Sequence, residues 1–369
     1  MDAHILMYSG YAAVGLIIVI FVIIFRLHKL KKQGENVEAG KANKVASFDD
    51  NDTRSIITKS DQYVAGESKS GFFLTSSAEQ SANFASTSLL VLTSPVVNGL
   101  KFDDMLKAPA ELLGRGRQST LYKIVLENGV LLVVKRIKDW EISTDDFKLR
   151  MQRLNQVKHQ NVLPAVAFYC SKQEKLLVYE YLQNGSLFRL LHGAQMGQAF
   201  DWVSRLSIAA TIAETLAFMH QEFRSDGIAH GNLKSSNILL NKNLEPCISE
   251  YGLVPLDNQG FKADVYGFGV ILLELLTGKL VKNEGVDLAT WVHSVVSEEW
   301  TGEVFDKLLI SGGASEERLV NLLQVALKCV NKSPEARPSM KQVAIMIVTL
   351  KEEEERSICT SVSVFSENF

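Results

Sequence analysis

The sequence lacks the cysteine spacing on which metal and disulfide sites are built. Its four cysteines, Cys170, Cys247, Cys329 and Cys359, lie far apart in a chain of 369 residues and form no C-x-x-C pair. This distribution argues against both a zinc site and a disulfide framework. A reduced, cytosolic environment fits the main domain best.

An excess of charge of one sign is also missing. The 39 Lys and Arg residues nearly balance the 42 Asp and Glu residues, which leaves a net charge of -3. A balanced chain offers no bulk field that attracts nucleic acid, so we expect no nucleic-acid partner. With 46% hydrophobic residues, the chain can bury the core of one large two-lobed domain with appendages.

One long apolar run lies at the N-terminus. The residues from Ile5 to Phe25 are nearly uncharged, and at about 1.5 Å per residue they can cross a hydrocarbon core of about 30 Å. Only Asp2 is charged before the run, whereas Arg26 and three lysines follow it, so a cleaved signal peptide is disfavoured. The sequence predicts a transmembrane helix over residues 8–25 in the cell membrane, with residues 1–7 outside and the rest in the cytosol. The alternative is a buried core helix, but the run is apolar on all faces.

The composition of residues 26–100 predicts that they form a juxtamembrane linker with little structure of its own. The segment is rich in Ser, Lys, Asn and Asp and shows no sustained period up to about Ser94. Its hydroxyl residues are either phosphorylation sites for another enzyme or parts of a solvated tether. A short strand-like run, LLVL from Leu89, precedes the next domain.

Two periodicities divide the main domain, residues 101–355. Up to about residue 182, short strand patterns alternate with turns, and one helical pattern runs from Phe147 to Val157. From Trp202 onward, apolar residues recur three and four positions apart, as in YGFGVILLELL. The sequence predicts an α+β fold in which a small β lobe precedes a larger helical lobe. Residues 356–369 are expected to form a C-terminal tail.

Six motifs occur in the order and approximate spacing of a protein kinase. They are LLGRGRQSTLYK, LVVKRIK, IAHGNLKSSNILL, ISEYGL, KADVYGFGVILLELLTGK and PEARPSM, spread over roughly residues 106–350. The amino-acid sequences of these motifs resemble those of the plant leucine-rich-repeat receptor-like kinases, in particular the inactive, pseudokinase subgroup. The resemblance implies a two-lobed protein-kinase fold. Without a leucine-rich-repeat part, the sequence is expected to be either a relative that has no ectodomain or a truncated product.

The resemblance implies a weakened nucleotide site. In that family a glycine-rich loop covers the ATP phosphates, and a strand lysine holds two of them. Gly114 and Gly116 match the first two glycines, but Ser119 takes the third position, where its Cβ limits the approach of the loop. Lys135 matches the lysine, and a plain β-turn between two strands is the alternative reading of the loop. The positions that match the stack around the adenine ring are Leu121, Val133 and Leu239.

The residues that carry chemistry in the family are replaced here. Asn232 stands where the catalytic base should be, and an amide cannot accept a proton near neutral pH. Arg150 stands where a helix glutamate should pair with Lys135, and no acid lies between residues 147 and 163 to substitute for it. We expect Arg150 to repel Lys135 and to pair with Asp146 one turn earlier, unless Asp146 is plain surface.

The magnesium ligands are altered as well. Asn237 keeps the ligand position of the catalytic loop, whereas Glu250 replaces the Asp of D-F-G. The extra methylene of glutamate displaces the carboxylate in a site that tolerates little misplacement. The resemblance therefore leaves ATP open as a cofactor and implies weak magnesium binding at most.

The activation segment is shortened. Eleven residues separate Gly252 from Asp264 and contain no A-P-E motif, so the peptide-binding ledge of the family does not fit there. Asp264 is expected to brace the catalytic loop, and Arg337 to lack its usual glutamate. His230 and Lys234 keep their structural positions in the loop. One hydrophobic stack of the fold is expected from Val166, Leu154, Tyr251 and His230.

Two functions follow from these replacements. The first is a membrane-anchored pseudokinase that serves as a signalling scaffold or regulator for active receptor-like kinases or their cytosolic substrates. The second is a weakly active or atypical serine/threonine kinase that relies on positioning alone, through Lys135, Lys234 and Asn237. Loss of the base, the ion pair, the third glycine and the peptide ledge favours the first.

Overall fold

The computed structural model describes residues 90–366 except for 117–118, 139–141, 172–173, 194–199, 254–259, 284–285 and 299–300. The chain divides into two units, residues 1–59 and 60–369, and every described residue belongs to the second. The expected transmembrane helix, residues 8–25, lies outside the described residues. Within them, no helix has both the length and the apolar character needed to cross a membrane.

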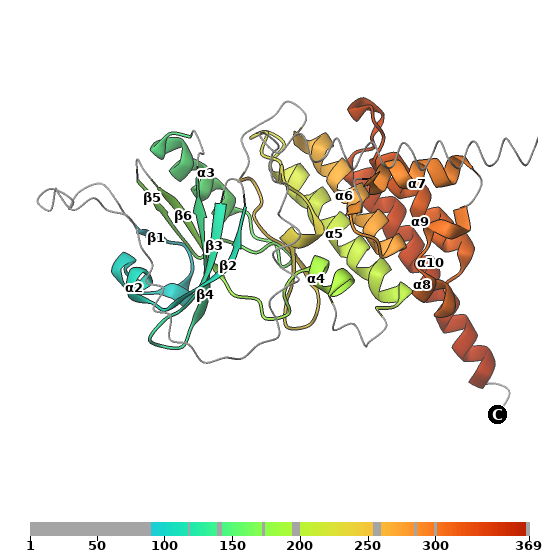
Figure 1. Ribbon diagram of the computed structural model, residues 1–369, viewed down its shortest axis with the longest axis horizontal. Helices are drawn as coiled ribbons and strands as arrows, with labels where there is room; N and C mark the ends of the chain where they lie inside the picture. The colour runs from blue at the N-terminus through green and yellow to red at the C-terminus, as the bar shows by residue number, and fades with distance from the viewer. Residues whose placement is uncertain are drawn as a thin grey trace, which may run out of the picture. The chain divides into compact units, whose positions relative to one another are not determined.

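The first lobe is built on one antiparallel sheet of six strands in the order β1-β5-β6-β4-β3-β2 (Figure 1). β3 and β4 pair along their whole length, from Ser119 opposite Ile137 to Val125 opposite Leu131. This register places Lys135 of β4 opposite Leu121 of β3. The strands are β1 (Leu90–Leu92), β2 (Ala110–Arg115), β3 (Ser119–Val125), β4 (Leu131–Ile137), β5 (Ala167–Cys170) and β6 (Lys175–Glu180).

The sheet begins earlier in the chain than the expected domain boundary at residue 101. β1 pairs with β5, with Val91 opposite Phe168, and the Thr93 amide donates to the Val166 carbonyl at 2.9 Å. The last part of the expected linker therefore forms an edge strand of the sheet.

Helices cover the two faces of this sheet. On one face lies α3 (Thr144–Gln156), which begins where the Ser143 hydroxyl accepts from the Asp146 amide. Its Phe147 ring packs edge-on against Phe168 of β5, with centroids 6.0 Å apart. On the other face lie η1 (Pro95–Val97) and α2 (Phe102–Lys107). Each face thereby buries its own hydrophobic cluster.

The position of Val166 differs from the expected hydrophobic stack. Its side chain is buried in the cluster on the α2 face of the sheet, whereas Leu154 of α3 packs on the opposite face. Ala165 and Phe168 share the face of Leu154. Strict alternation is interrupted at this point, because Val166 and the next residue, Ala167, lie in the same cluster, so position in the motif alone does not decide which face Val166 occupies.

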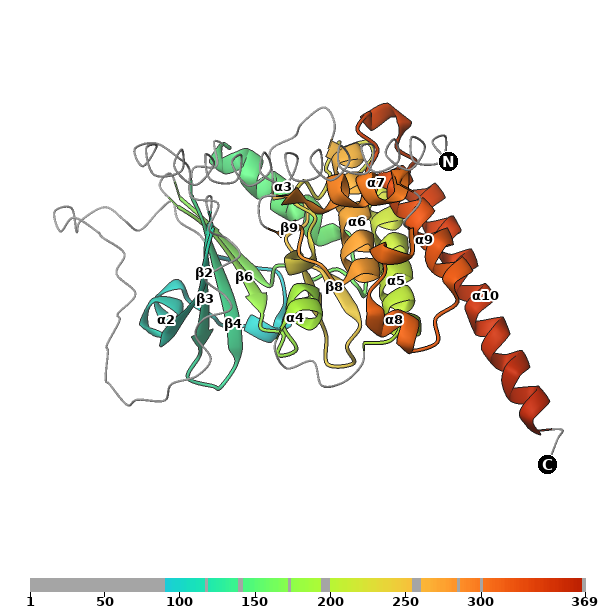
Figure 2. The same cartoon turned by 45° about the vertical axis from the view of Figure 1, so that its right-hand side comes forward.

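The second lobe is mainly helical, with α5 and α6 at its centre (Figure 2). Ala209 and Leu216 of α5, together with Phe268 and Leu272 of α6, are fully buried in its core. Its helices are α4 (Leu187–His192), α5 (Trp202–Glu222), η2 (Ser235–Asn237), α6 (Gly260–Thr277), α7 (Leu288–Ser297), η3 (Thr301–Val304), α8 (Lys307–Ser311), α9 (Glu316–Cys329), η4 (Pro334–Ala336) and α10 (Met340–Ser366). Two short hairpins pair β7 (Ile238–Leu240) with β8 (Pro246–Ile248) and β9 (Lys282–Asn283) with β10 (Val286–Asp287).

The last helix continues through most of the expected C-terminal tail. α10 packs along α5 and ends at Ser366 rather than near residue 355. Glu354 joins it to two other helices, because its Oε2 accepts from Trp202 Nε1 at 2.8 Å and from an Arg318 nitrogen at 2.6 Å. This buried carboxylate therefore ties α10 to α5 and α9 near the expected end of the domain.

Candidate functional site

The catalytic-loop segment is held by a carboxylate of α6. Asp264 is 1% exposed, and its two oxygens accept from the backbone amides of His230 and Gly231, each at 2.8 Å. His220 Nε2 of α5 lies 3.0 Å from the same carboxylate. Asp264 thus braces the loop from below, as its position in the motif implied, and the contact with His220 was not foreseen.

His230 is buried as a neutral imidazole. Its Nδ1 accepts from the Asn232 amide at 3.2 Å, so the proton resides on Nε2, which donates to the Ser249 carbonyl at 2.9 Å. Burial lowers the pKa of His230, although Asp264 and Glu250 act in the opposite direction. The ring of Tyr251 packs edge-on against the imidazole, with centroids 5.6 Å apart.

This buried imidazole makes the stability of the fold depend on pH. Below the ordinary histidine pKa of about 6.5, the unfolded chain binds a proton that folded His230 rejects, so stability falls as the pH falls. We expect the free energy of unfolding to decrease from pH 7.5 to pH 5.5, with a slope that approaches about 1.4 kcal/mol per pH unit for one proton. Urea unfolding across this range measures it.

The matched variant is His230→Gln, which removes the titrating group. Its slope should be smaller than that of the parent chain over the same pH range, whatever its absolute stability. His159, whose pKa is also lowered by burial, supplies a remaining slope of the same sign. An unchanged slope in His230→Gln would contradict the assignment.

Two asparagines occupy the loop positions that carry chemistry in kinases. Asn232 is exposed, and its side chain makes no hydrogen bond to any residue that the structure describes. Asn237 is buried, and its amide group donates to the Asn232 carbonyl at 2.8 Å. The Asn237 carbonyl accepts from both the amide and the hydroxyl of Ser249. The loop is therefore well ordered but presents an amide, and no base, at residue 232.

The most informative contact of the site is an ion pair between Lys135 and Glu250. The Nζ of Lys135 lies 2.5 Å from Oε2 of Glu250, and the two side chains are 10% and 12% exposed. The sequence led us to expect a lysine without a partner and a glutamate placed for magnesium. The longer side chain of glutamate instead neutralises the lysine across the two lobes.

The backbone around Glu250 is constrained. Glu250 has a φ of 64°, in the left-handed region that non-glycine residues seldom occupy. Gly252 has a φ of 73°, and a Cβ there would lie 2.9 Å from Ile228 and 3.0 Å from Leu154. Between them, the Tyr251 hydroxyl donates to the Ile228 carbonyl at 3.2 Å. These contacts fix the direction in which the Glu250 carboxylate points.

Arg150 lies on α3, partly buried, and burial lowers the pKa of its guanidinium group. The expected pairing with Asp146 is not observed, because the Asp146 carboxylate accepts from the Ser143 hydroxyl at 2.6 Å at the start of the helix. Asp146, which the i, i+4 spacing assigned to Arg150, instead contributes to the N-terminal cap of α3.

The glycine-rich loop forms a tight connection between β2 and β3. The Gly116 amide donates to the Ser119 carbonyl at 2.8 Å, as in a turn that closes on itself. A Cβ at Gly114 would meet open space, and one at Gly116 only ordinary contacts with Ser119. The protein itself therefore does not require glycine at either position.

The remaining expected residues lie around this centre. Arg337 has no glutamate partner among the described residues and donates instead to the carbonyls of Asn331 and Lys262, at 2.8 and 2.9 Å. Its guanidinium also lies over the Tyr266 ring, 4.9 Å from the centroid. Lys234 is exposed. The three positions of the adenine stack, Leu121, Val133 and Leu239, are half-buried.

These residues fit a magnesium nucleotide poorly. In active members of the family the lysine pairs with a helix glutamate while it holds phosphate, and a separate carboxylate binds the metal, whereas here Lys135 pairs with the carboxylate at the metal position. Among the described residues, no three His, Cys, Asp or Glu side chains gather as a metal site. The residues present therefore do not support a catalytic step through magnesium.

A loop braced on α6, a strand lysine and a D-F-G-like segment define a protein kinase fold with an altered catalytic site. A family model described as the protein kinase domain matches residues 108–261. A probably inactive receptor-like protein kinase of Arabidopsis thaliana is 38% identical over 66% of this chain and 82% of its own length. The chain belongs to this family, the receptor-like protein kinases of plants, among relatives named inactive.

Other relatives are longer. A probable inactive receptor kinase of Arabidopsis thaliana is 41% identical over 68% of this chain but only 44% of its own length. The chain thus spans less than half of that relative.

Among solved structures, the pseudokinase domain of BIR2, an immune regulator of the RLK/Pelle family, matches with a TM-score of 0.62. It is 30% identical over 72% of this chain and 91% of that chain. The maize SIRK1 kinase domain bound to AMP-PNP matches with a TM-score of 0.63. It is 29% identical over 71% and 99% of the two chains.

Proposed function

We propose that this protein is an inactive receptor-like kinase, anchored in the cell membrane by one span, that acts as a scaffold or regulator of active receptor-like kinases. The observation that carries the proposal is the Lys135–Glu250 ion pair. It occupies both charges that an active kinase directs at its nucleotide. Asn232 removes the base as well.

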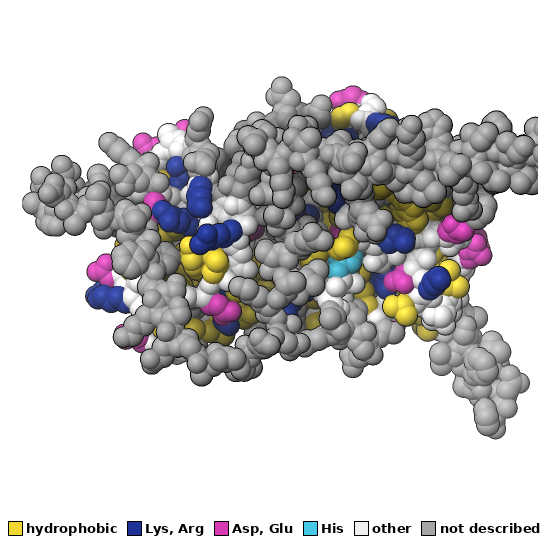
Figure 3. All heavy atoms as spheres, in the orientation of Figure 1, with side chains coloured by type: hydrophobic (Ala, Val, Ile, Leu, Met, Phe, Trp, Pro, Cys, Tyr) yellow, Lys and Arg dark blue, Asp and Glu magenta, His cyan; other side chains and the backbone are white. Residues whose placement is uncertain are grey.

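The regulatory part of the proposal rests on the preserved fold and on similarity. The loop and the cores of both lobes keep the kinase fold, whereas the family's catalytic residues are replaced. This combination suits a protein that partner proteins bind through its surface. BIR2, a solved pseudokinase of similar fold, is described as an immune regulator. The face drawn in Figure 3 carries acidic and basic side chains of both signs, which suits a protein partner better than nucleic acid.

The test is phosphate transfer from labelled ATP with magnesium to a generic protein substrate. The purified full chain should transfer no more phosphate than its Lys135→Met/Glu250→Gln variant, since the missing base alone removes about 10²–10⁴ in rate. The double variant is the matched control, because it removes both charges together and leaves neither buried alone. Transfer clearly above this control would favour the second function, a weakly active serine/threonine kinase.

A restored variant shows that the assay can detect activity. It combines Asn232→Asp, Glu250→Asp and Arg150→Glu, which return the base, the metal ligand and the helix glutamate. Any transfer by this variant, set against none by the parent chain, assigns the inactivity to these three positions.

The ion pair also predicts how the chain responds to nucleotide. Because Glu250 is engaged by Lys135, ATP with magnesium should raise the unfolding temperature no more than ATP alone. Thermal unfolding of the full chain at millimolar ATP, with magnesium or with EDTA, measures this difference. A clear shift that depends on magnesium would show that Glu250 leaves Lys135 to bind the metal.

A further inference from the structure

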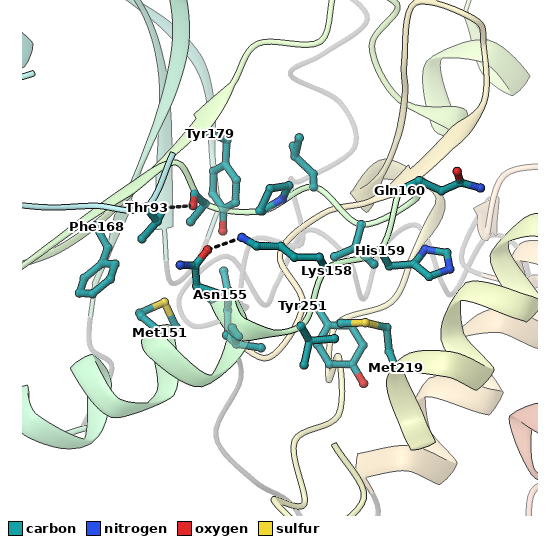
Figure 4. A pocket seen from close by; sticks show the side chains of 17 residues that line it. Thr93, Met151, Asn155, Lys158, His159, Gln160, Phe168, Tyr179, Met219 and Tyr251 are labelled. Carbon is teal, nitrogen blue, oxygen red and sulfur yellow. Dashed lines mark hydrogen bonds between the residues drawn. The ribbon is translucent and has the colours of Figure 1, made fainter. Parts of the chain in front are cut away.

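A cavity of about 350 Å³ has walls from both lobes (Figure 4), and neither member of the ion pair lines it. Its walls come from the end of α3, the segment from Val157 to Ala165, and the rings of Tyr179 and Tyr251. The described residues of the glycine-rich loop do not line it. Its volume falls within the range of small-molecule sites, about 300–1,000 Å³.

The described part of the cavity wall is mainly apolar and carries no acidic side chain. Most of the lining side chains are apolar, and the described residues that line the cavity include no Asp or Glu. The nearby carboxylate of Glu250 is already neutralised by Lys135. A bound molecule therefore meets apolar surface together with a few polar groups.

The Tyr179 hydroxyl is a hydrogen-bond donor on the cavity wall, carried by a side chain that is largely buried. The residue is 7% exposed, and its hydroxyl makes no hydrogen bond to any residue that the structure describes. Burial, together with the charge of Glu250, raises the pKa of Tyr179 far above its ordinary value, so the phenol keeps its proton. An acceptor group in the cavity would therefore receive a hydrogen bond from a neutral phenol.

The other polar groups on the wall are donors as well. Lys158 brings the only lysine or arginine cation of the lining and donates to Asn155 Oδ1 at 2.6 Å, which leaves the Asn155 amide hydrogens free. Thr93 uses its hydroxyl hydrogen on the Ala165 carbonyl. In Figure 4 the Tyr179 hydroxyl points toward the end of the cavity where Lys158 meets Asn155. Donors and one positive charge thus gather at one end of an apolar space.

We propose that this cavity binds a small apolar acid. The apolar body of the ligand lies against Met151, Leu154 and Phe168, and its carboxylate accepts from Tyr179 and faces Lys158. An amine of the same shape is disfavoured, because the described lining residues offer it a cation and hydrogen-bond donors but no carboxylate. The proposal does not depend on whether the protein transfers phosphate.

The test is calorimetric titration of the full chain in lipid nanodiscs, with empty nanodiscs as the blank. The probes are 2-naphthoate and 2-naphthylmethylammonium, which share an apolar body and differ in charge. The expected result is saturable binding of the acid and at least about tenfold weaker binding of the amine. No binding of the acid, or equal binding of both probes, overturns the proposal.

Three variants locate the site. Tyr179→Phe removes only the hydroxyl and Lys158→Gln only the charge, and each should weaken naphthoate binding about tenfold. Ala165→Leu fills the cavity and should abolish binding. Tyr179→Phe should unfold at the same temperature as the parent chain or higher, which separates lost binding from lost folding. Unchanged naphthoate affinity in Tyr179→Phe and Ala165→Leu would place the probe elsewhere and overturn the proposal.

Discussion

Replacement of Lys135 by methionine is expected to lower the free energy of unfolding by about 3–5 kcal/mol. The substitution leaves the carboxylate of Glu250, 12% exposed, without the ammonium group 2.5 Å away. A buried charge that has lost its partner keeps its desolvation cost and loses the attraction that offset it. Urea unfolding, followed by circular dichroism of the full chain, measures the change.

Adding Glu250→Gln to that variant should restore most of the lost stability, because the amide carries no charge to desolvate. The exposed pair of Lys123 and Glu111, whose atoms are 3.7 Å apart, supplies the control: Lys123→Met should cost no more than about 1 kcal/mol. If Lys135→Met cost as little as Lys123→Met, Glu250 would not depend on the lysine.

The sequence could not reveal this ion pair because the two residues come from different lobes. The motifs placed Lys135 on a strand, which agrees with the structure, whereas the short strand β8 that precedes Glu250 was not predicted. Which charge a lysine selects, however, depends on side-chain length and on backbone direction. The left-handed backbone of Glu250 and its extra methylene decide that direction, and neither gives a sequence period.

Local patterns predicted the elements well. The helical period from Phe147 to Val157 corresponds to α3, which spans Thr144–Gln156, and the strand patterns correspond to β2, β3, β4, β5 and β6. Such periods report which face of an element is buried, and that requirement is strong in both lobes. The error at Val166 arose where the alternation of side chains is interrupted, because Val166 and Ala167 lie on the same face of the sheet.

Residues at the ends of elements were harder to assign. Asp146 has the right spacing to pair with Arg150, but it also lies in the first turn of α3, where the Ser143 hydroxyl binds it. The sequence spacing indicated the pairing with Arg150 and did not reveal the bond to Ser143. The same holds for Glu354, whose bonds to Trp202 and Arg318 link residues more than thirty positions apart.

The second large effect is expected at Asp264. Its replacement by alanine should lower the free energy of unfolding by about 3–5 kcal/mol. The buried amide of His230 loses its acceptor, at about 1–3 kcal/mol, the less buried amide of Gly231 loses a hydrogen bond to a charged group, and His220 loses its partner. Hydrogen exchange at the two amides should rise in step with the loss of global stability, or faster if the loop opens alone.

Asp264→Asn and Asp287→Ala separate the contribution of the brace from that of an ordinary carboxylate. The substituted amide side chain would keep one acceptor oxygen and present a donor to the other backbone amide, so Asp264→Asn should lose less stability than Asp264→Ala. Asp287 accepts only from backbone and hydroxyl of Thr290 at the start of α7, so Asp287→Ala should cost about 1 kcal/mol. If Asp264→Ala lost no more stability than Asp287→Ala, the carboxylate of Asp264 would not be what holds the loop. The loop would then be held by its own hydrogen bonds, from Asn237 to Asn232 and from His230 to Ser249. If Asp264→Ala lost more stability than Asp287→Ala, the hydrogen bonds of Asp264 would explain why this loop, which has no catalytic base, keeps the conformation of a kinase catalytic loop.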